Sequence, residues 1–143
     1  MAHLSTFVFS EDSKEVLNRN GQGTSLHIIN PQNVFRPMFV PGAHSFSVTL
    51  GINGLDTSHN NSFQLIIRPE AKGSEATVNT NEIPLPPNPE GQDPILPKEA
   101  VGMMFNLDFR NVPFKVAGKY IAEIFVNGEL IEDKPLYVYP IGQ

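Results

Sequence analysis

A repeat of two in the apolar residues is the feature that most constrains how this chain can fold. The clearest case covers residues 46–52, FSVTLGI. Successive side chains of a β-strand point to opposite faces, so this alternation predicts a strand with one buried and one polar face. The pattern recurs over 62–68 and 103–110. Its apolar positions are Phe46, Val48, Leu50 and Ile52, then Phe63, Leu65 and Ile67, then Met103, Phe105, Leu107 and Phe109.

Further strands are expected over 4–9 and 25–29, and Asn-Gly and Pro-Gly pairs between the apolar runs mark turns. The one helical candidate is a turn near 10–18, with Ser10 as its cap. No internal repeat is visible.

Residues 69–100 form a polar, proline-rich segment. Proline lacks a backbone donor, so this segment cannot be a central strand and is expected to be a long loop. Loops of this length in compact domains are usually functional or mobile.

The end of the chain, 118–140, predicts a β-hairpin. Asn127-Gly128 is a strong two-residue turn signal, because a type I′ turn needs positive φ at both positions. A two-residue turn would pair Ile124 with Ile131, and Leu136 also looks buried. Ile131 and Leu136 differ by an odd number, so one residue must be absorbed, and we expect a β-bulge around 133–135.

Gly118 and Tyr120 match the spacing of a tyrosine corner, in which a tyrosine near the start of a strand bonds back to nearby backbone. Ala122 stands where immunoglobulin domains carry a cysteine, so the corner would be kept without the disulfide. Together with the short strands, this predicts an all-β fold: an immunoglobulin-like antiparallel β-sandwich of about seven strands with a long Pro-rich loop. The length suits a single domain over 1–143.

The chain resembles a family of small bacterial immunoglobulin-like proteins of unknown function. The resemblance rests on a short N-terminal strand, the stretch PGAHSFSVTLGI, the segment FRNVPF and the ending GKYIAEIFVNGELIEDKPLYV. It covers most of the chain except the proline-rich loop. These motifs are structural and the family has no assigned catalytic residues, so the resemblance implies a fold and no active site.

The expected strand register leaves four large side chains on the outward face of the closing hairpin: Ile121, Phe125, Tyr137 and Tyr139. Either the 69–100 loop or the N-terminal segment covers them, or they form a protein-binding surface, or the assignment of faces is wrong.

Composition and motifs argue against several function classes. The net charge of −5, with ten scattered Lys and Arg, is unfavourable for nucleic-acid binding, which needs clustered cations. The chain has no cysteine, and its four histidines are not spaced as metal ligands, so no metal site and no cofactor are expected. His59 lies beside Asp56 and Ser58, but the GxSxG motif of a nucleophile elbow is missing. No signal peptide and no membrane span are recognisable, which favours a cytoplasmic location, in a bacterium or encoded by a phage.

We therefore expect a non-enzymatic immunoglobulin-like interaction module that binds an unidentified protein or a second copy of itself. Three alternatives stay open: a structural or accessory protein of a phage particle, a carrier with a small-ligand pocket between its sheets, and an enzyme with an unrecognised site. A carrier would contain an enclosed apolar cavity. An enzyme would bring polar groups with perturbed pKa values together in a cleft.

Overall fold

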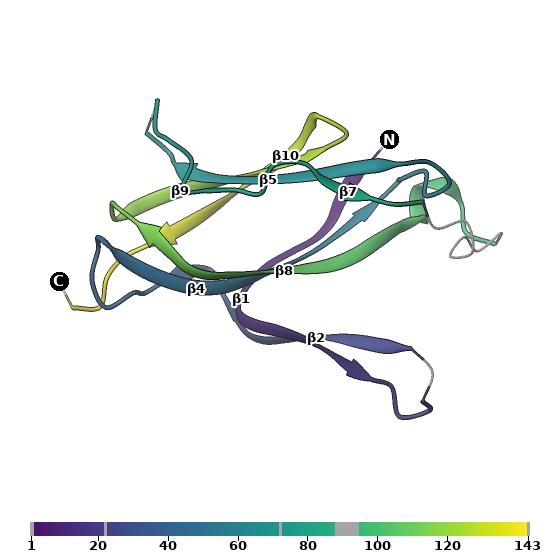
Figure 1. Cartoon of the computed structure of the whole chain (residues 1–143), viewed down its shortest axis with the longest axis horizontal. Coiled ribbons are helices and arrows are strands. Elements are labelled where there is room, and N and C mark those ends of the chain that lie inside the picture. Colours follow the sequence, from purple (N-terminus) through teal and green to yellow (C-terminus); the bar gives the residue numbers. More distant parts are fainter. Residues whose placement is uncertain (1, 22, 72, 88–94, 143) are drawn as a thin grey trace.

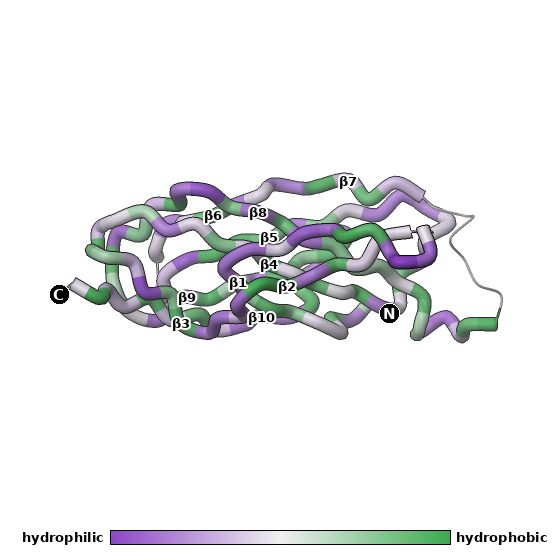
Figure 2. The backbone as a smooth tube through the Cα atoms, turned by 90° about the horizontal axis from the view of Figure 1, so that it is seen from below, coloured by the Kyte–Doolittle hydropathy of each residue, from purple (hydrophilic) through white to green (hydrophobic). Residues whose placement is uncertain are grey.

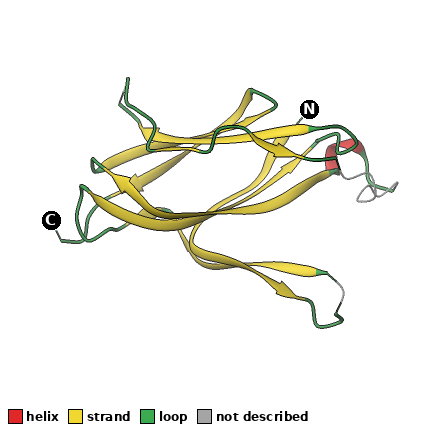
Figure 3. Ribbon diagram, in the orientation of Figure 1, coloured by secondary structure: helices red, strands yellow, loops and turns green. Residues whose placement is uncertain are grey.

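A computed structural model describes residues 2–21, 23–71, 73–87 and 95–142, and its strands form two stacked sheets (Figures 1 and 3). The strands are β1 (His3–Leu17), β2 (Thr24–Gln32), β3 (Val34–Phe35), β4 (Gly42–Asn53), β5 (Asn61–Pro69), β6 (Val78–Asn79), β7 (Ile83–Leu85), β8 (Gly102–Phe114), β9 (Gly118–Val126) and β10 (Glu129–Val138). A 3₁₀ turn, η2, covers Lys98–Ala100.

The order of the strands is that of an immunoglobulin-like sandwich. One sheet has the order β2-β1-β4-β8, and the other has β3-β10-β9-β5-β6, with β7 also paired to β5. In immunoglobulin lettering, β4 and β8 occupy the adjacent positions B and E, while β5, β9 and β10 occupy C, F and G. The pairs are antiparallel except for the short contact between β3 and β10. The predicted all-β, immunoglobulin-like fold is confirmed.

The core lies between the inward faces of β4, β5 and β9, and it uses the apolar positions that alternation predicts. Figure 2 shows hydrophobic and hydrophilic residues alternating along the strands. These inward side chains have at most 3% of their surface exposed: Phe46, Val48, Leu50 and Ile52 on β4, Phe63, Leu65 and Ile67 on β5, and Tyr120, Ala122, Ile124 and Val126 on β9. Phenylalanine rings at one end pack edge-on, for example Phe9 against Phe35 at 5.5 Å. The sequence pattern therefore assigned the buried faces of these strands correctly.

The predicted half-exposure of β4 is wrong, because its outward face is buried as well. Ser47 and Thr49 have no exposed surface. The Ser47 hydroxyl bonds to Asp108 on β8, and β1 flanks the other side. A central strand between two long neighbours is thus enclosed despite its polar residues.

The helical turn expected near 10–18 is also wrong, because these residues continue β1. β1 pairs with β4 over His3–Ser10 and with β2 over Phe9–Leu17. Its second half therefore leaves the sandwich and forms, with β2, a hairpin that projects from the β4–β8 layer (Figure 1). Two contacts tie the root of this hairpin to β8: Asn106 Nδ2 donates to Ser13 Oγ at 2.8 Å, and Arg110 Nη2 lies 3.4 Å from Asp12 Oδ1.

The segment 69–100 is a loop only in part. β6 and β7 pair with β5 at the edge of the second sheet, and Val78 and Leu85 are 8% exposed members of the core. Pro84 lies in β7, where an edge position tolerates a residue without a backbone donor. Residues 72 and 88–94 of this segment lie outside the described residues.

The closing hairpin has the predicted turn, but its bulge lies elsewhere. Asn127 and Gly128 have φ values of 52° and 80°, and Glu129 pairs with Val126 across them. The register shifts between Leu130 and Glu132 rather than near 133–135. A bulge directly after the turn lets Ile131 pack against the core, and Pro135 needs no bulge because this part of β10 is a sheet edge.

Candidate interaction surface

The outward face of β9 and β10, with the adjoining face of β5, carries the candidate residues, and we call it the β9–β10 face. Ile121 and Phe125 are half-buried on β9, between inward residues that are fully buried. Tyr137 is 37% exposed and Tyr139 is 48% exposed. Ile121, Phe125 and Tyr137 thus share one side of one sheet, Tyr139 directly follows β10, and both tyrosines reach solvent.

The strand register shows which neighbours complete this face. Phe125 is paired with Gln64 on β5 and with Leu130 on β10. Ile121 is paired with Arg68 and Pro135. Leu130, 46% exposed, is a member that the sequence pattern missed. The predicted two-residue turn pairs Leu130 with Phe125, so the same register already placed this side chain on the outward face.

Ion pairs interrupt the apolar side chains. Arg68 Nε and Nη2 donate to the two carboxylate oxygens of Glu123 at 2.9 and 3.4 Å, between the levels of Phe125 and Ile121. The hydrogen bond to Glu123 raises the pKa of Arg68, and a similar bond to Glu70 raises the pKa of Lys119. The pair of Lys119 and Glu70 is exposed and adds little stability, whereas the pair of Arg68 and Glu123 is partly buried. Both pairs fix charges in known positions on this face.

The backbone around Tyr139 is held firmly. Its N–H donates to the Phe35 carbonyl at 3.0 Å, and its own carbonyl accepts from Arg36 Nε at 2.7 Å. The ring is therefore presented from a fixed main chain, which lowers the entropy lost when a partner binds.

Behind this face, Gly118 and Tyr120 build the turn that enters β9. The Tyr120 hydroxyl donates to the Val116 carbonyl at 2.6 Å, and Gly118 has a φ of 128°, a conformation suited to glycine. Burial raises the pKa of Tyr120. This is the geometry of a tyrosine corner, a structural device that anchors the start of the strand.

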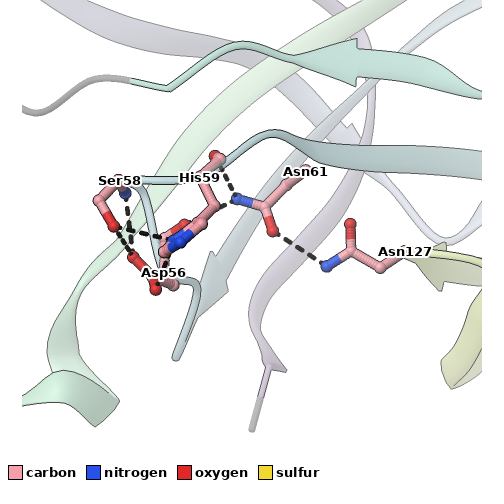
Figure 4. Close-up of polar contacts among 5 residues, drawn as sticks. All are labelled: Asp56, Ser58, His59, Asn61 and Asn127. Carbon is pink, nitrogen blue, oxygen red and sulfur yellow. Dashed lines mark hydrogen bonds and ion pairs between the residues drawn. The ribbon is translucent and has the colours of Figure 1, made fainter.

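The one cluster resembling a catalytic triad does not have a triad's geometry (Figure 4). Asp56 Oδ2 and Ser58 Oγ both approach the same nitrogen of His59, Nδ1, at 2.8 and 3.0 Å. A triad needs its acid and its nucleophile on different ring nitrogens. Hydrogen bonds from Ser58 lower the pKa of Asp56, which fits an exposed polar turn rather than a base that takes protons near neutral pH.

This turn instead connects two loops. Asn61 Nδ2 donates to the Asp56 carbonyl at 3.0 Å, and Asn127 Nδ2 donates to Asn61 Oδ1 at 2.9 Å. The cluster therefore braces the β9–β10 turn against the start of β5.

Within the described residues, no group of three or more His, Asp or Glu side chains could hold a metal ion. No helix among these residues is long and apolar enough to cross a membrane. A groove of about 470 Å³ lies where β1 approaches β10, lined by Phe7–Phe9, residues 31–33, Lys134 and Pro135. It opens at the side of the sandwich, unlike the enclosed apolar cavity expected of a carrier.

No protein-family model matches the chain, and no curated protein sequence matches it. Among solved structures, an immunoglobulin-like protein from Pseudomonas aeruginosa is similar at a TM-score of 0.42 and 10% identity, with 97% of each chain covered.

Proposed function

We propose that this chain is a non-enzymatic interaction module that binds a protein partner through the β9–β10 face. The observation that carries the proposal is the exposure of large side chains at both ends of this face: Tyr137 and Tyr139 at one end, and Leu130 beside the half-buried Phe125 at the other. Aromatic residues are enriched in protein interfaces and concentrate their binding energy.

The surroundings of these side chains support a role in a protein interface rather than in the hydrophobic core. The described strands of segment 69–100 lie beside β5 at the sheet edge and leave the tyrosines exposed. Arg68, Glu123 and Lys119 supply fixed charges near the rings. These charges lie between the apolar side chains and give the face a mixed polar and apolar character, which is common in reversible protein contacts.

The test compares the wild-type chain with the double variant Tyr137→Ser/Tyr139→Ser in pull-downs from the cells that encode it. Leu17→Ser is the matched control, since it removes a 73% exposed apolar side chain from the β1–β2 hairpin. We expect at least one cellular protein to be captured by the wild-type chain and by the control, but not by the double variant. With that protein purified, the variant should bind at least about tenfold more weakly, the effect of losing one or two anchors.

A chemical melt accompanies the binding measurement. Substitutions at exposed positions shift the unfolding free energy by less than about 0.5 kcal/mol. Equal capture by all three chains, or a double variant that is destabilised by several kcal/mol, would refute the proposal.

A further inference from the structure

The other sheet ends in a long strand with an open edge. β8 is 13 residues long and pairs with β4 along most of its length. Within the described part of the chain, no strand pairs with its other side. Such an edge presents a row of backbone N–H and C=O groups that can pair with another strand.

Other edges of this protein carry features that discourage pairing. On β10, Glu132 and Lys134 pair with the inward residues Ile124 and Ala122, and they form an ion pair of 3.0 Å. Inward-pointing charges and prolines are common protections of edge strands. Pro84 in β7 and Pro31 in β2 are further examples.

β8 is protected only near its end. Its register shifts opposite Ser45, Asn111 has a φ of 54°, and Pro113 follows. From Gly102 to Phe109 the strand has no proline, no lysine and a single charged residue, Asp108. This stretch is therefore left suitable for strand addition.

The core-facing side chains of β8 are also only partly shielded from solvent. Met103, Phe105, Leu107 and Phe109 face the core and yet are only half-buried, whereas the β4 residues paired with them are fully buried. The difference arises because β8 has a strand on one side only. A second apolar strand beside β8 would remove this remaining surface from water.

We propose that two copies of this chain pair antiparallel along β8, around a two-fold axis at Asn106. Residues opposite each other in an antiparallel pair share a face. In this register Met103 faces Phe109 of the second copy, and Phe105 faces its Leu107. Apolar side chains meet apolar ones on the inner face, so the strand is complementary to itself, as a two-fold interface requires.

Charge argues against the register whose axis lies two residues further along, at Asp108. On the outer face Met104 lies opposite Asp108 of the second copy, and the two Asn106 side chains meet at the axis. Moving the axis to Asp108 would place two carboxylates directly opposite each other, which is destabilising. The product is one continuous sheet through both copies, on the side of the sandwich opposite the β9–β10 face.

The first experiment measures sedimentation of the purified chain over a range of concentrations. We expect a monomer–dimer equilibrium, weakened about fivefold by Asn106→Asp, which places like charges across the axis. This change keeps an oxygen that can bond to Ser13. Asn79→Asp, the same change in β6 on the other sheet, is the control and should leave the equilibrium unchanged.

The second experiment fixes the register. The chain has no cysteine, so Asn106→Cys introduces one thiol per copy. Directly opposed residues have Cβ atoms about 4.5–5.5 Å apart, close to what a disulfide spans. Mild oxidation should crosslink the Asn106→Cys chain rapidly, and Met104→Cys and Tyr137→Cys slowly.

Three results would overturn the proposal. One is a chain that remains monomeric at about 1 mM, the weak limit of useful affinity. Another is a dimer in which Asn106→Cys crosslinks no faster than Tyr137→Cys. The third is a dimer that resists Asn106→Asp but is lost in Tyr137→Ser/Tyr139→Ser, which would assign self-association to the β9–β10 face.

Discussion

Removing the hydroxyl of Tyr120 tests how the tyrosine corner contributes to stability. Tyr120→Phe keeps the buried ring and its edge-on contact with Phe114, whose centroid is 5.4 Å away. It deletes only the bond to the Val116 carbonyl, which is 2.6 Å long. The expected cost is therefore the net value of one hydrogen bond, about 0.5–1.5 kcal/mol.

The acceptor's position sets the result within that range. Val116 is 49% exposed, so we expect water to reach its carbonyl in the variant and keep the cost near 1 kcal/mol rather than the larger penalty of an orphaned buried group. For a chain of this size the thermal midpoint should fall by about 2–4 °C. Tyr120→Ala, in contrast, would empty a fully buried site and cost about 3–5 kcal/mol.

Urea denaturation followed by circular dichroism measures these differences, with Tyr137→Phe as the control. That change deletes the same group from an exposed side chain and should alter the unfolding free energy by less than about 0.5 kcal/mol. If Tyr120→Phe lowers the unfolding free energy no more than the control does, the hydrogen bond contributes nothing to stability and the corner is not a stabilising element.

Alkaline pH gives an independent check. Burial raises the pKa of Tyr120 above its ordinary value of 10.0. The unfolded chain therefore loses its proton first as pH rises, and wild-type stability should decline above pH 10. Tyr120→Phe should lack this part of the decline.

Three other changes follow from the packing. Burial lowers the pKa of His44, whose ring lies 4.7 Å from Phe35, so wild-type stability should fall as pH drops below the ordinary value of 6.5, and titration of His44→Phe by thermal melts should show a smaller fall. Gly102→Ala should cost about 1–3 kcal/mol in a urea melt, because the new Cβ would lie 1.8 Å from the Ile52 carbonyl oxygen; an unchanged midpoint would contradict this close approach. Leu85→Ala should cost about 2 kcal/mol by the same method if β7 belongs to the core, and a negligible loss would return segment 69–100 to the status of a loop.

Strand periodicity predicted the sandwich because burial on one face is recorded locally in the sequence. Phe63, Leu65 and Ile67 alternate with half-buried residues, and all three are in the core. The Asn127-Gly128 turn was equally predictable from the sequence, because few residue pairs adopt a positive φ at both positions. The outward position of Ile121 and Phe125 followed from the same parity.

The remaining features depend on partners distant in the sequence. Residues 11–15, EDSKE, carry no strand alternation, and they are extended because β2 pairs with them. The bulge at Ile131 reflects which side chain the core accommodates after the turn. The β6 and β7 strands are too short for any periodicity, and they exist because β5 offers them an edge.

The bonds of Arg36 have a consequence for the order in which the chain folds. Its guanidinium joins the carbonyls of Tyr139 and Pro140, 103 and 104 positions along the chain, and β3 pairs with β10 beside it. Closing so long a loop costs more entropy than closing the β9–β10 hairpin. The hydrogen bonds of Arg36 should therefore form after the rate-limiting step of folding. Arg36→Ala should then speed unfolding while leaving the refolding rate nearly unchanged. The Arg36 hydrogen bonds would thus contribute to the kinetic stability of the assembled sandwich.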